Sequence, residues 1–137
     1  MKKLLLLLAA FGFFTSSWAQ TQVKILTVVE SIVPMGIGRS RIIESVDTVS
    51  STFLSNINTA RDEMRIEKFN EIKLLNLYSG VGINFQNIAS NDAIVTAKLI
   101  SLLGEGWKIS FVLGGVESNA GKDDGQGIFV TRYILTK

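Results

Sequence analysis

The sequence predicts an α+β fold, in which one amphipathic helix packs on a face of a mostly antiparallel sheet of four to five strands. Apolar residues recur with helical spacing over residues 92–103, and residues 107–114 then alternate between apolar and polar or small side chains. Three further stretches, residues 22–33, 39–46 and 127–136, are rich in β-branched residues. A helix that leads into a hairpin therefore forms the centre of the predicted domain.

The predicted helix has both ends specified by local residues. Ser90 or Asn91 can cap its first turn, and Gly104 can take the left-handed conformation that ends a helix. At 100° per residue, Lys98 and Ser101 lie opposite a broad apolar stripe. The stripe consists of Val95, Thr96, Leu99, Ile100, Leu102 and Leu103.

The two strands after this helix differ in pattern. In residues 107–114 the large apolar side chains are Trp107, Ile109, Phe111 and Leu113, which predicts one apolar face that meets the helix stripe. Residues 127–136 are apolar on both faces except at Arg132, so we expect this strand inside the sheet.

The first 19 residues have the pattern of a secretory signal peptide. Two lysines precede an apolar run over residues 4–14, and small residues at Ser17 and Ala19 suit signal peptidase. An uncleaved membrane anchor is the alternative, but the run is much shorter than the roughly 20 residues that a spanning helix needs. We therefore expect an exported protein, periplasmic or secreted, whose single domain covers residues 20–137 without a transmembrane segment.

The amino-acid composition excludes several kinds of partner and of catalytic chemistry. Without residues 1–19 the chain carries 12 basic and 12 acidic residues, so no basic excess predicts a nucleic-acid partner. The chain has neither cysteine nor histidine, which excludes disulfides, thiol chemistry and histidine-based triads. We expect no cofactor, no metal and no catalytic residue.

Two glycine-rich stretches are candidate ligand-binding sites. Residues 34–38 form a predicted turn between the first two strands, and the turn with its flank offers an anion site built from Gly36, Gly38, Arg39 and Arg41. The alternative is a plain hairpin turn. Residues 119–127 resemble a calcium loop in composition, but the oxygen ligands lack the required spacing, which favours a hairpin tip.

The middle of the chain gives weaker signals. Residues 47–71 combine a Ser, Thr and Asn-rich linker with a charged flanking helix that starts at a capping box over residues 59–62. Residues 74–79 have the composition of a strand.

Either residues 39–46 or residues 74–79 should form the sheet edge, and the second is less protected by charge. We predict association there, through Leu75, Leu77, Tyr78 and Asn84.

The second half of the chain resembles a group of small bacterial α+β domains of unknown function. The residues that carry the resemblance are the helix, the tetrapeptide over residues 104–107, the following strand and the closing segment over residues 127–133. The sequence departs from that pattern at Lys108, where an acidic residue is expected. The resemblance implies a fold and no activity.

Three functions remain open. The leading hypothesis is a non-enzymatic module that binds another protein or itself. A small-molecule or anion-binding protein is the first alternative, and a carboxylate-based hydrolase is the second.

Overall fold

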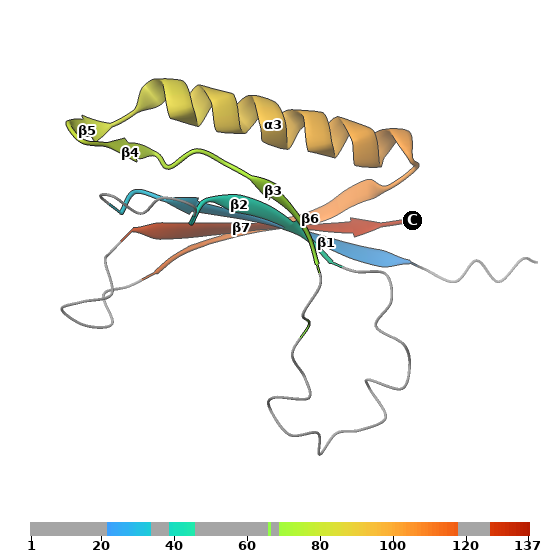
Figure 1. Ribbon diagram of the computed structural model, residues 1–137. Helices are drawn as coiled ribbons and strands as arrows, with labels where there is room; N and C mark the ends of the chain where they lie inside the picture. The colour runs from blue at the N-terminus through green and yellow to red at the C-terminus, as the bar shows by residue number, and fades with distance from the viewer. Residues whose placement is uncertain (1–21, 34–38, 46–65, 67–68, 118–126) are drawn as a thin grey trace, which may run out of the picture.

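The chain folds into an α+β structure, seen in a computed structural model that describes residues 22–33, 39–45, 66, 69–117 and 127–137 (Figure 1). One helix, α3 (Phe85–Gly104), lies along one face of a five-stranded antiparallel sheet. The sheet contains β1 (Val23–Ser31), β2 (Arg41–Glu44), β3 (Asn70–Lys73), β6 (Lys108–Val116) and β7 (Ile128–Thr136). A separate two-stranded sheet contains β4 (Tyr78–Ser79) and β5 (Gly82–Ile83).

The strand order of the large sheet is β3-β2-β1-β7-β6, and every neighbouring pair is antiparallel. The interior position predicted for residues 127–136 is confirmed, because β7 lies between β1 and β6. The prediction that residues 39–46 or 74–79 form the edge is wrong. Strand β2 is interior, and the two edges among the described strands are β3 and β6.

The core lies between α3 and the sheet. Apolar side chains of β1, β2 and β7 meet Leu102 and Trp107, and Ile94, Val95 and Leu99 pack against them from the helix. Full burial of one such side chain stabilises the fold by about 1.5 to 3 kcal/mol. The fully or nearly buried members are Leu26, Val28, Ile42, Leu74, Leu102, Trp107 and Leu135.

The helix is longer than its sequence pattern predicts. It begins at Phe85, because the Asn84 side chain accepts hydrogen bonds from the backbone N–H groups of Gln86 and Asn87 and so caps the first turn. The predicted start at residue 92 is wrong. Hydrophobic periodicity does not reveal the earlier start, because the first two turns of α3 contain few apolar residues. At the other end, the glycine with positive φ is Gly106 at 92° and not Gly104.

A β-bulge in β6 reverses the predicted alternation. Ile109 lies opposite Leu135, whereas Phe111 lies opposite Ile134, so Ser110 is an extra residue without a partner position. Trp107 is buried in the core as predicted. Phe111 and Leu113 instead lie on the other face of the sheet, 66% and 57% exposed.

The charged helix predicted within residues 47–71 and the strand predicted over residues 74–79 are also corrected. Residues 70–73 form β3, which pairs with β2, and of residues 74–79 only Tyr78–Ser79 form a strand. Residues 47–65 and 67–68 lie outside the described residues. Within the described ranges, no helix is both long enough and apolar enough to cross a membrane.

Candidate functional site

The sheet face opposite α3, here called the open face, carries several exposed apolar side chains, among them Val23, Ile25, Phe111 and Leu113. Partners across an antiparallel sheet point to the same side, so the registers define its rows. One row runs Ile43, Thr27, Arg132, Leu113, and the next runs Ile25, Ile134, Phe111. No described helix or strand covers this face (Figure 1). Burial of so much apolar surface against another molecule is favourable.

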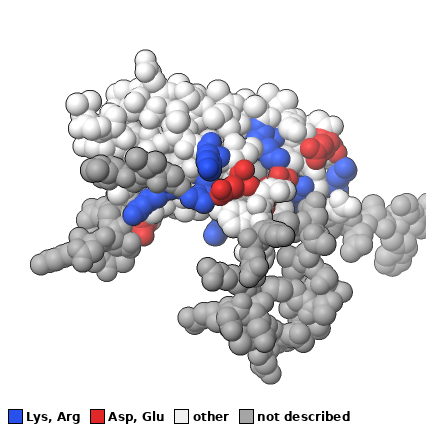
Figure 2. Space-filling model, viewed as in Figure 1, with Lys and Arg blue, Asp and Glu red and all other residues white. Residues whose placement is uncertain are grey.

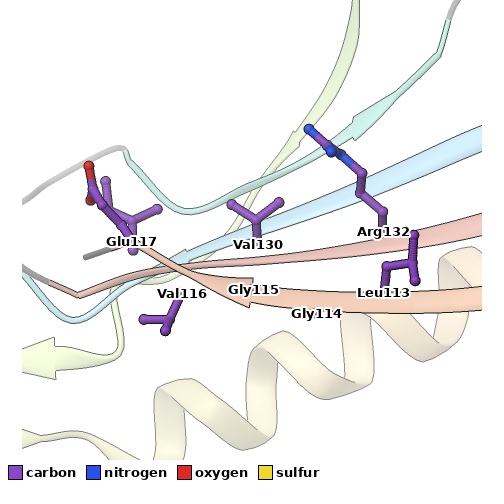
Figure 3. Close-up of a pocket in the computed structure, with 8 residues that line it drawn as sticks. Leu113, Gly114, Gly115, Val116, Glu117, Val130 and Arg132 are labelled. Atoms are coloured by element: carbon purple, nitrogen blue, oxygen red, sulfur yellow. The ribbon is translucent and has the colours of Figure 1, made fainter.

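A hollow of about 470 Å³ lies on the β6–β7 part of the sheet. Figure 3 shows Val130 and Arg132 pointing away from α3, with Gly114 and Gly115 beside them. Gly115, which lies opposite Val130 on this face, leaves the strand surface low because it has no side chain. Arg132 is exposed, and no ion pair within the described part of the chain involves it. A guanidinium is well suited to bind a carboxylate or phosphate.

Charged side chains elsewhere gather in a band below α3, while the upper surface of the helix is almost free of charge (Figure 2). The open face itself carries Arg132, Lys73 and the ion pair between Arg41 and Glu71, whose Nη1 and Oε2 are 2.8 Å apart. Basic groups therefore outnumber acidic ones on the rows that these strands form.

A second constellation lies on the helix side of the sheet and has no signal in the sequence. Glu44 accepts from Lys24 Nζ at 3.0 Å and from Lys98 Nζ at 2.7 Å. Lys24 Nζ also lies 4.9 Å from the centre of the Trp107 ring, within range of a cation–π interaction. Lys24, Glu44, Lys98 and Trp107 are far apart in the sequence. The pairing of β1 with β2 and the packing of α3 on the sheet bring them together.

The electrostatics of this charged cluster favour a structural role. Burial alone would raise the pKa of Glu44, but hydrogen bonds and attraction from Lys98 and Lys24 outweigh it, so the pKa of this carboxyl is lowered. The carboxylate stays ionised and both of its oxygens are engaged. It is therefore poorly suited to accept a proton from a substrate.

None of the residues predicted for partner binding lies in the five-stranded sheet, and Tyr78 lies in β4 of the small sheet. The amide of Asn91, which is fully buried, donates to Leu75 O and accepts from Leu75 N, each at 2.9 Å. Leu77 N donates to Ser31 O, and Leu77 O accepts from Asn84 N. The structure thus brings Leu77 and Asn84 together, but these backbone groups are already satisfied and offer no free strand edge.

The predicted anion site is only partly described. Gly36 and Gly38 lie outside the described residues, Arg39 is exposed, and Arg41 is paired with Glu71. Of the predicted hairpin tip over residues 119–127 the structure describes only Gly127. Within the described ranges, no group of three or more His, Cys, Asp or Glu residues is placed to hold a metal ion.

Comparison of the chain with protein-family models, with curated proteins and with solved structures finds no match in any of the three. The resemblance to small bacterial α+β domains therefore stays a prediction, and the functional argument rests on the surfaces described above.

Proposed function

We propose that the protein is an exported, non-enzymatic binding module whose contact surface is the open face. The observation that carries this proposal is the row of apolar side chains from β1, β7 and β6 that no described element covers. When a partner buries a hydrated apolar surface of this kind, the free energy of association becomes more favourable.

The charges on this face indicate the chemistry of the partner. Arg132 stands between Thr27 and Leu113, in the row next to the apolar row of Ile25, Ile134 and Phe111, and Lys73 lies at the β3 end of the sheet. A partner surface with apolar side chains and a few acidic groups complements this arrangement. Glu44 and Glu71, each already engaged by basic side chains, give the hydrolase hypothesis no support.

Site-specific photocrosslinking tests the proposal. A photoreactive phenylalanine analogue replaces Val23 on the open face, and a matched variant carries it at Ile100 on the outer side of α3, two positions that are 59% and 63% exposed. Irradiation of the exported fraction should give a discrete protein adduct from position 23 and none from position 100. Equal labelling at both positions, or no adduct at position 23, would contradict the open face as the contact surface.

A second candidate function, the binding of a small amphipathic anion, is favoured by the hollow beside Arg132. Its apolar lining by Leu113, Ile128 and Val130 suits a hydrocarbon body, and the guanidinium suits a carboxylate. Decanoate should raise the melting temperature of the parent and of Lys73→Gln, and should leave that of Arg132→Gln unchanged. The same shift in all three proteins would reject this site.

A further inference from the structure

The outer edge of β6 is longer and less charged than the other edge of the sheet, which β3 forms. All nine residues of β6 are exposed, and no described strand pairs with its outer side. Every second residue of an edge strand turns its backbone N–H and C=O groups outward, where they can pair with another strand. The side chains that flank this edge are mostly large and apolar: Ile109, Phe111, Val112, Leu113 and Val116.

The opposite edge is protected. Strand β3 has only four residues, and two of them, Glu71 and Lys73, are charged. Short length and charge are the usual means by which natural sheets prevent edge pairing. Strand β6 has neither over residues 109–116, because its single charged residue, Lys108, stands at its first position.

The charges at the two ends of β6 indicate what pairs with it. Lys108 begins the strand, Glu117 follows its last residue, and their registers place both on the open-face side. When β6 lies antiparallel to a second β6, each Lys108 falls beside the Glu117 of the other copy. A parallel arrangement would bring like charges together, so the charge pattern favours a two-fold, antiparallel pair.

We propose that β6 pairs with β6 of a second copy of this chain, so that the two five-stranded sheets join into one continuous sheet. Because Ser110 is the extra residue of the bulge, the two-fold axis then passes near Leu113. Both copies of α3 lie on one side of the joined sheet, and the two open faces lie on the other. This inference rests on the proposed binding function and deepens it, because self-pairing doubles the apolar surface that a partner meets.

Single cysteines test the pairing, since the natural chain has none. In a two-fold antiparallel pair only a residue near the axis faces its own copy closely enough for a disulfide, which needs Cβ atoms about 3.5 to 4.5 Å apart. Phe111→Cys, Val112→Cys and Leu113→Cys are compared with Val116→Cys on the same strand, Ile72→Cys on β3 and Ile100→Cys on α3.

Under mild oxidation, at least one of the three central variants should form a disulfide-linked dimer at least ten-fold faster than the three controls. The proposal is overturned if no central variant is faster than Ile72→Cys or Ile100→Cys, or if the parent chain sediments as a monomer at all concentrations. Circular dichroism confirms that each variant compared is folded.

Charge reversal provides a second test that leaves the core untouched. Lys108→Glu and Glu117→Lys should each raise the dimer dissociation constant about ten-fold, since each dimer contains two such contacts and each reversal turns both into like-charge pairs. The double variant should restore the parent value in sedimentation equilibrium, whereas additive weakening would reject the antiparallel contact. Photocrosslinking at position 23 without cysteine coupling in β6 would leave the binding function standing and remove only the dimer.

Discussion

At the scale of single residues, Trp107 contacts several parts of the structure at once. Its ring belongs to the core cluster, lies beneath the ammonium group of Lys24, and is 5.9 Å from Lys137 Nζ. Its backbone N–H donates to Leu102 O at the end of α3. One side chain therefore joins the helix end, the first strand and the chain segment that enters β6.

Truncation of this side chain should be costly. We expect Trp107→Ala to lower the free energy of unfolding by about 3 to 5 kcal/mol, because the surrounding core cannot close a cavity of that size. Urea unfolding followed by circular dichroism measures the loss. In the parent, tryptophan emission should be blue-shifted when folded and move to the red on unfolding. A loss below about 1 kcal/mol would place Trp107 outside the effective core.

Gly127 precedes β7 and has no room for a side chain. It is buried, its φ is 107°, and a Cβ there would overlap the side chain of Ile32. We expect Gly127→Ala to destabilise the fold by about 1 to 3 kcal/mol through backbone strain and this overlap. Gly104→Ala is the matched control, because Gly104 lies in α3 and a Cβ added there would meet no other atom within 4 Å. That control should be neutral or slightly stabilising in the same thermal melt.

At the scale of elements, the charged cluster ties β1 and β2 to α3. The pKa of Glu44 is lowered in the folded state from an ordinary value of 4.5. A lowered pKa means that the ionised carboxylate stabilises the fold above about pH 4.5, and that this contribution disappears as the pH falls through the lowered value. Folding stability should therefore decline on acidification in a way that depends on Glu44.

The variant Glu44→Gln isolates this contribution. It should lose about 2 to 3 kcal/mol at neutral pH, since Lys24 and Lys98 remain close to each other without the carboxylate. Its stability should also change less than that of the parent between neutral pH and about pH 3. Glu71→Gln, which breaks the more exposed pair with Arg41, should cost less than about 1 kcal/mol. Parallel pH profiles for the parent and Glu44→Gln would show that the cluster does not stabilise the fold.

The elements also show where sequence reasoning succeeds and where it fails. The strands around Val28 and Ile134 and the burial of Trp107 follow from local patterns, and the structure confirms them. The sequence does not reveal the bulge at Ser110. One extra residue moves every later side chain of the strand to the opposite face, but the composition of the strand stays the same. The segment around Leu75 has the composition of a strand, yet its backbone is satisfied by the side chain of Asn91.

The candidate site is the hardest part to predict. Its rows combine residues of β1, β7 and β6 that are distant in sequence, and the strand order decides which of them share a face. The sequence marks Arg132 only as an exception in an apolar strand. Its position in the middle of the open face depends on Thr27 and Leu113, whose registers the sequence does not encode locally.

At the scale of the whole molecule, export is the first question. The pattern of residues 1–19 predicts cleavage after Ala19, so mature protein should begin at Gln20. Intact-mass measurement on exported material decides this, with a variant of the cleavage site, Ala19→Pro, as the control that should keep the leader. Recovery of exported protein that retains residues 1–19 would refute the processing prediction.

The sheet is covered by a described helix on one face only, and this asymmetry has a calorimetric consequence. Apolar groups on the open face are already hydrated in the folded monomer, so unfolding exposes less new apolar surface than in a domain with two covered faces. The heat capacity increment on unfolding should fall below the ordinary value of about 12 to 15 cal/mol/K per residue. Differential scanning calorimetry on dilute protein measures it. Water released from that face when a partner binds should appear as a negative heat capacity change of association.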